Sequence, residues 1–162
     1  MRFVKETLAR RLVGVVAMLL AVGPAVVVAA PSAEAATASP AMIAAYQVRI
    51  VQRINAVRAF YGRGPLWTAN CPTWFAIQWS NHLASTGTFY HQSMYPILRV
   101  CRASKAAENL ARGNVSADSF VAAWLASPGH CANILDPALN RVGISAVYAR
   151  GQWTITTDFA RF

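Results

Sequence analysis

The chain has 162 residues, and 15 lysines and arginines against six acidic residues give it a formal net charge of +9 at pH 7. This length is enough for one domain and too short for two of ordinary size. The basic residues are scattered and form no stripe interleaved with aromatic residues, so we expect no nucleic-acid partner. An anionic cell-wall polymer is a partner that would suit the positive charge.

The first 35 residues have the pattern of a signal peptide. A basic start precedes an apolar stretch from Leu12 to Ala30, and Ala33-Glu34-Ala35 offers a cleavage site. A single membrane anchor is the alternative, because the apolar stretch approaches the length that spans a bilayer. Gly23 and Pro24 interrupt the stretch and favour cleavage. We therefore expect a secreted, extracellular protein, cleaved near Ala35, that touches the membrane only through its signal peptide.

A linker at 36–41 is expected to lead into one domain at 42–162. Apolar residues at helical spacing predict helices over 43–61, 70–86, 117–125 and 128–135. The second helix ends at Gly87, a natural residue for the position after a helix. Its core face is expected to hold Phe75, Ala76, Trp79 and Leu83.

The remaining segments predict a loop and a few strands. Residues 88–105 are expected to form a loop with at most a short turn, and 106–112 to form a strand. A hairpin is predicted from strands at 141–148 and 152–159. Apolar and polar residues alternate in the last strand, which predicts one buried face and one polar face. Helices followed by an antiparallel hairpin indicate an α+β fold.

The most distinctive stretch is Ser127-Pro128-Gly129-His130-Cys131-Ala132-Asn133-Ile134-Leu135, at the start of the fourth helix. Ser127 is a good N-cap residue, and Pro128 suits the first helical position, where its missing N–H costs nothing. His130 then lies near the positive end of the helix dipole. This position favours the neutral imidazole, which is the form that binds metals or accepts a proton.

Together with shorter motifs, this stretch resembles the CAP superfamily of cysteine-rich secretory proteins, antigen 5 and pathogenesis-related-1 proteins, and its small secreted bacterial branch in particular. The shorter motifs are Asn55 with Arg58, His91 with Ser93, Glu108 with Asn109, Trp124 and Phe159. The resemblance covers residues 42–160 and implies a three-layer α-β-α sandwich with a central antiparallel sheet, the CAP or SCP fold. In that setting Asn55 and Arg58 are expected to stabilise the fold, and Asn133 to hydrogen-bond loop backbone.

In that family two histidines and two acids line a central cleft, which implies a site of His91, His130 and Glu108 here. Two imidazoles and a carboxylate suit a zinc or copper ion, so these residues are the candidate metal ligands and zinc the candidate cofactor. They are also the candidate catalytic residues, because they could do acid–base work on a bound water. The third interpretation is a structural cluster in which the polar groups satisfy one another.

Two departures from the family pattern count against hydrolysis. No Asp or Glu lies between Gln92 and Ala107, where the second acid of the family is usually found. The acid–acid geometry is therefore expected to be lost. Ala107 also replaces the glycine before the Glu-Asn motif, and alanine is strained there if the position needs a positive φ. These departures favour a protein that is not an enzyme.

Three cysteines lie outside the predicted signal peptide, so an exported protein is expected to hold one disulfide and one free thiol. The residues alone leave the pairing open. The family resemblance implies Cys71–Cys101, because related sequences tend to carry another residue at the position of Cys131.

Three functions are consistent with these features. The first is a secreted, monomeric binding module whose cleft holds a divalent metal or a small apolar ligand, since members of the family bind sterols and fatty acids. The second is a metal-assisted hydrolase or peptidase that uses the same cleft. The third is a cell-surface interaction protein in which the cleft is vestigial and the basic exterior makes the contacts.

Overall fold

The computed structural model describes residues 38–162. The predicted signal peptide at 1–35 and the first two residues of the predicted linker lie outside the described residues. Within the described part, no helix combines the length and the apolar character that a membrane crossing requires.

The domain begins with helix α1 (Pro40–Phe60), which starts inside the linker expected at 36–41. The Met42 N–H donates to Ser39 Oγ at 3.2 Å, and Pro40 occupies the first turn, so this end carries both the side-chain cap and the proline that favour a helix start. Ile50, Ile54 and Val57 are buried on the core side, as their spacing predicted.

The remaining elements follow in the order β1 (Trp67–Thr68), α2 (Asn70–Thr86), α3 (Tyr95–Val100), β2 (Lys105–Gly113), α4 (Ala117–Ala126), α5 (Pro128–Leu135), β3 (Arg141–Ala149) and β4 (Gln152–Arg161). Strand β1 was not predicted, because two residues carry no periodicity. Helix α3 lies in the segment that was expected to be a loop. The other elements match the predicted ones to within a few residues.

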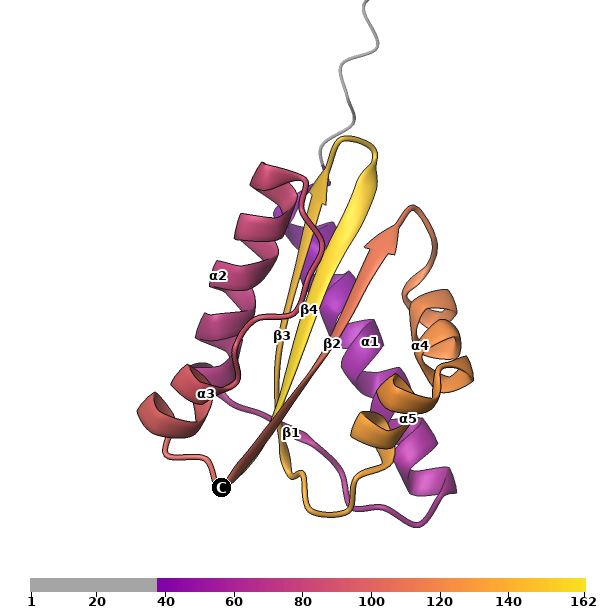
Figure 1. Ribbon diagram of the computed structural model, residues 1–162. Helices are drawn as coiled ribbons and strands as arrows, with labels where there is room; N and C mark the ends of the chain where they lie inside the picture. Colours follow the sequence, from indigo (N-terminus) through magenta and orange to yellow (C-terminus); the bar gives the residue numbers. More distant parts are fainter. Residues whose placement is uncertain (1–37) are drawn as a thin grey trace, which may run out of the picture. The chain divides into compact units, whose positions relative to one another are not determined.

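The strands form one four-stranded sheet in the order β1-β3-β4-β2. Strands β3, β4 and β2 are antiparallel neighbours, while β1 pairs parallel to β3 over two residues at the edge. Helices α2 and α3 lie on one side of the sheet and α1, α4 and α5 on the other (Figure 1). The predicted α+β class and the implied α-β-α sandwich with a central antiparallel sheet are confirmed.

The last strand differs from its predicted pattern. Both faces of β4 are buried from Trp153 to Ala160, whereas one face was expected to be polar and open. The reason is its central place in the sheet, because helices cover both faces. Thr156 and Asp158 therefore lie in the interior although their side chains are polar.

Helix α2 buries a face that agrees only in part with the predicted one. Ala76 and Leu83 are buried as expected, but Ser80 joins them, while Phe75 and Trp79 are half-buried. Small residues suit this contact because α2 lies very close to the sheet. A Cβ atom built on Gly143 of β3 would come within 2.2 Å of the backbone of Pro72 and Thr73. The close approach of α2 therefore depends on a glycine in β3.

Candidate functional site

His91 and Glu108 meet as the sequence implied. His91 lies in the segment between α2 and α3, and Glu108 lies on β2. The Nδ1–H of His91 donates to Glu108 Oε1 at 2.6 Å. The His91 side chain is 59% exposed and the Glu108 side chain is 2% exposed, so the ring lies at the surface on a buried carboxylate. The contact holds the ring in place and leaves its Nε2 free.

Two further residues complete this cluster, and sequence analysis assigned neither of them to it. Gln92 Nε2 donates to Glu108 Oε2 at 2.9 Å and to both carboxyl oxygens of Asp158 at 3.1 Å. The backbone N–H of Gln92 also donates to Glu108 Oε1 at 3.2 Å. Asp158 is fully buried on β4, directly opposite Glu108 in the β2–β4 register.

A second carboxyl therefore lies beside Glu108 although the sequence offered none, but it is buried rather than open to the cleft. The second carboxyl comes from the last strand rather than from the segment after the first histidine. The signal that could have revealed it is an aspartate in a strand whose neighbours are apolar or β-branched. Such a residue is unusual in a strand interior unless it has a polar partner.

Burial controls the charge of this pair. Desolvation and, to a smaller extent, the neighbouring Glu108 raise the pKa of Asp158 to about 8, although a hydrogen bond from Gln92 opposes the shift. Burial also raises the pKa of Glu108, but hydrogen bonds from Gln92 and His91 oppose this shift. Two carboxyl groups this close do not both ionise readily. At neutral pH Asp158 is consequently the member of the pair that keeps its proton.

His130 reaches the same region from α5. The centroids of the His91 and His130 rings are 6.5 Å apart. Desolvation lowers the pKa of His130, and the nearby His91 lowers it as well, so its imidazole is neutral at neutral pH. His91 therefore lies near both of the other candidate residues: it bonds Glu108, and its ring lies 6.5 Å from that of His130.

Helix α5 begins where the sequence predicted, with Pro128 in its first turn. Ser127 occupies the N-cap position, but its side chain makes no capping hydrogen bond. Its carbonyl instead accepts from the Cys131 N–H at 2.8 Å. The predicted N-cap position of Ser127 is therefore confirmed, while the expected hydrogen bond from its side chain is not formed.

Asparagine side chains fasten α5 to the sheet. Asn109 Nδ2 donates to the His130 carbonyl at 3.2 Å. Asn133 Nδ2 donates to Asn109 Oδ1 at 2.9 Å and to the Glu108 carbonyl at 3.1 Å. Asn133 thus binds strand β2 rather than the loop backbone expected for it. These contacts fix the position of His130 relative to Glu108.

Asn55 and Arg58 lie on α1 and hydrogen-bond backbone groups next to β1 and at the end of α5. Asn55 exchanges two hydrogen bonds with the backbone of Leu66. Arg58 is 1% exposed and donates to backbone carbonyls that belong to Gly64, Ile134, Asp136 and Leu139. Their predicted role as polar contacts that stabilise the fold agrees with this geometry.

Two other expectations can be checked at the site. Cys71 and Cys101 form a disulfide, and Cys131 is a free cysteine, as the family resemblance implied. Ala107 lies in regular β2, and among the described residues only Arg102 and Arg150 combine a side chain with positive φ. The alanine before Glu108 is therefore unstrained.

A cavity of about 320 Å³ adjoins His130. Its walls are mostly apolar and include Phe89, Leu110, Phe120 and Trp124. The Arg112 guanidinium lies 4.9 Å from the centre of the Phe89 ring. Such a combination of apolar walls and a few polar groups is typical of small-molecule sites.

Residues 51–159 match the cysteine-rich secretory protein family, and the chain therefore belongs to this family, also called CAP. It is 30% identical over 125 residues to the uncharacterized protein YkwD of Bacillus subtilis (strain 168), covering 73% of this chain and 49% of the relative. The chain thus spans about half the length of the curated relative that it matches.

Solved structures show the same fold at low sequence identity. An extracellular protein containing an SCP domain from Bacillus anthracis str. Ames superposes with a TM-score of 0.67 at 20% identity, over 78% of this chain and 45% of that one. An outer surface protein from Borrelia burgdorferi gives a TM-score of 0.62 at 18% identity, over 69% of this chain and 89% of that one. A cysteine-rich secretory protein from Staphylococcus aureus gives 0.65 at 14% identity, over 76% and 40%.

Proposed function

We propose that this chain is an extracellular CAP-domain binding module that holds a divalent metal ion between His91 and His130. The observation that carries the proposal is the pair of imidazoles, one of them oriented by Glu108 at 2.6 Å. The extracellular setting is supported by the disulfide and by related structures described as extracellular or outer surface proteins.

The donor set fits zinc as a two-histidine site. Two imidazoles on one tetrahedral zinc, at a Zn–N distance of about 2.0–2.1 Å, have ring centres about 5 Å apart. The observed separation is 6.5 Å, which small side-chain rotations can close. The described residues contain no cluster of three or more histidine, cysteine or acidic side chains arranged for a metal. We accordingly assign Glu108 as the hydrogen-bond partner of His91 rather than as a ligand of the metal.

Each residue has a separate task in this site. Glu108 accepts the Nδ1–H of His91 and so presents Nε2 as the donor atom, which is the usual arrangement of a carboxylate behind a metal-binding histidine. Desolvation keeps His130 neutral and able to bind. When bound, zinc would supply a Lewis-acidic centre for a ligand's oxygen or nitrogen atom.

The adjoining cavity supports a second candidate, a small apolar ligand. Phe89, Leu110 and Trp124 provide apolar walls, and His130 provides a polar group at one end. A ligand with an apolar body and one polar group would fill this cavity and reach the histidines. Hydrolysis has less support, because Glu108 and Asp158 are buried and hydrogen-bonded beneath Gln92.

Calorimetric titration of zinc chloride into the protein that begins at residue 36 tests the proposal. We expect one zinc per chain, with binding lost in the His91→Ala/His130→Ala double variant. Glu108→Gln should weaken binding by about 10- to 100-fold, because the partner that orients His91 is impaired.

The matched control is His82→Ala, which removes a histidine of α2 that bonds Tyr90 Oη at 2.9 Å and lies outside the site. This variant should bind zinc as the unaltered protein does. If the double variant gives the same heat as the unaltered protein, or if neither binds, the metal proposal is wrong.

A further inference from the structure

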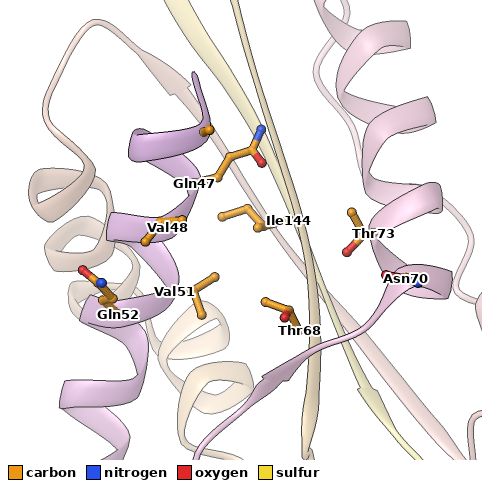
Figure 2. Close-up of a pocket in the computed structure, with 9 residues that line it drawn as sticks. Gln47, Val48, Val51, Gln52, Thr68, Asn70, Thr73 and Ile144 are labelled. Carbon is orange, nitrogen blue, oxygen red and sulfur yellow. The ribbon is translucent and has the colours of Figure 1, made fainter. Parts of the chain in front are cut away.

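A second pocket of the described residues lies on the opposite edge of the sheet from the histidines. It has a volume of about 430 Å³ and opens between α1 and α2, beside β1 and β3 (Figure 2). Gln47 and Val51 project into it from α1, Thr73 faces it from α2, and Ile144 of β3 lies between them. This volume is in the range of sites that bind a ligand. The site proposed above makes no use of this pocket.

The pocket lies where the edge of β3 loses its partner strand. The Trp67 N–H donates to the Asn140 carbonyl, and the Ala69 N–H donates to the Val142 carbonyl. After Ala69 the chain turns away into α2, so β1 pairs with β3 only as far as Val142. In the described part of the chain, no other strand continues this edge.

Strand geometry then fixes where the next backbone groups point. Both backbone polar groups of one strand residue point to the same edge, and the edge alternates along the strand. Because the Val142 carbonyl faces β1, the N–H and C=O of Ile144 face the same edge, away from β4. Ile144 is 6% exposed and lines the pocket. The pocket therefore opens onto backbone groups that the sheet does not pair.

The lining of the pocket restricts the chemistry of an occupant. The nine described residues that form it include no ionisable side chain, although the chain as a whole is strongly basic. Val48, Val51 and Ile144 supply apolar surface. Gln47 and Asn70 supply amides, each of which can both donate and accept hydrogen bonds. No aromatic side chain is present on which a sugar ring could stack.

We propose that this pocket binds an uncharged, extended peptide segment of a partner protein, which adds to β3 at Ile144 as a strand. An extended peptide matches each observed feature. Its backbone pairs with the free edge, its remaining amides meet the glutamine and asparagine side chains, and a small apolar side chain enters between Val51 and Ile144. Addition of a strand to an open sheet edge is a known mode of peptide recognition.

Amide NMR spectra of the nitrogen-15-labelled protein test this inference. The probe is the blocked peptide acetyl-Val-Thr-Val-Thr-Val-amide, and the comparison probe is the same peptide methylated at every backbone nitrogen. We expect the first peptide to shift the amide signals of Ile144 and of the α1 and α2 residues around the pocket. The methylated peptide should bind at least about tenfold more weakly, because it cannot donate backbone hydrogen bonds.

Two tryptophan variants on α1 provide the matched pair. Ala44→Trp fills the pocket from an exposed position, whereas Ala45→Trp places the same group on the next residue, which is exposed and outside the lining. Binding should be lost in the first variant and kept in the second. The inference is overturned if the Ile144 signal does not respond, if the methylated peptide binds equally well, or if Ala44→Trp has no effect. Zinc binding at the histidines is measured separately and decides only the proposed function.

Discussion

A single residue, Asp158, adds a second buried carboxyl group to the site of His91 and Glu108. Asp158 is separated from Glu108 by almost a third of the chain, yet the antiparallel register of β2 and β4 sets them side by side. Gln92 bridges them and, through its sequence neighbour His91, connects the buried pair to the surface. Because Asp158 keeps its proton at neutral pH, it adds no negative charge beside Glu108.

Asp158 should make the stability of the protein fall as the pH rises. Its pKa is about 8 in the folded protein, against an ordinary value of 3.8, so between these values the folded state binds a proton that the unfolded state has lost. The free energy of unfolding should therefore decrease with pH across this window, by up to about 1.4 kcal/mol per pH unit from this group. In Asp158→Asn this contribution should vanish, as measured by urea unfolding at pH 5, 6, 7 and 8.

The comparison is made against the unaltered protein at each pH, because His130 acts in the opposite direction. Its pKa is lowered, so stability from that group increases as the pH rises. Asp118→Asn is the control, since Asp118 is a surface carboxylate paired with Arg49. An identical pH dependence in Asp158→Asn and the unaltered protein would show that Asp158 is already ionised.

Among the elements, α2 and α5 are held to the sheet by different means. Helix α5 is held by hydrogen bonds from three side chains. Asn109 of β2 and Arg58 of α1 donate to carbonyls of α5, and Asn133 of α5 donates to a carbonyl of β2. Helix α2 is fastened by close packing on β3 at Gly143, where backbone meets backbone. The side-chain contacts of α5 can adjust to a small shift of the helix. The backbone contact of α2 at Gly143 leaves no room for an added atom.

Gly143→Ala should therefore destabilise the fold. The added methyl group would overlap the backbone of Pro72 and Thr73, which cannot move without shifting α2. We expect a loss of about 1–3 kcal/mol in the free energy of unfolding, the usual range for overpacking. Urea unfolding of the purified variant measures this loss.

Gly129→Ala is the matched substitution in α5. A Cβ atom there has open space around it, so this variant should be equally stable or up to about 1 kcal/mol more stable. Equal stability of the two glycine variants would mean that α2 can move away from β3 at little cost.

At the scale of the whole molecule, the disulfide joins the two helices on one side of the sheet. Cys71 lies in the first turn of α2, and Cys101 directly follows α3, 30 residues later. The bond closes a segment that includes His91 and Gln92. It therefore restrains the loop that covers the carboxyl pair.

Removing the disulfide should cost about 3–4 kcal/mol, because the unfolded chain gains the freedom of a loop of this length. We expect this loss in the Cys71→Ser/Cys101→Ser variant, measured by urea unfolding. Cys131→Ser should change stability by less than about 0.5 kcal/mol, since Cys131 is half-buried and unpaired among the described cysteines. Equal losses in the two variants would contradict this assignment.

The sequence by itself determined the elements with strong local signals. The helices and the hairpin follow from the periodicity of apolar residues along the chain. The motifs from Asn55 to Phe159 also determined the family, and with it the meeting of His91, Glu108 and His130. Each of these depends on residues close together in the chain or on a motif already known.

Only the tertiary structure decided which polar groups are buried together. Asp158 and Gln92 were not assigned to the site because their contact arises from the register of two strands distant in sequence. The same holds for the buried polar face of β4 and for the pocket at the open edge of β3. Burial and strand pairing depend on every neighbouring element at once, and no local pattern of side chains carries that information.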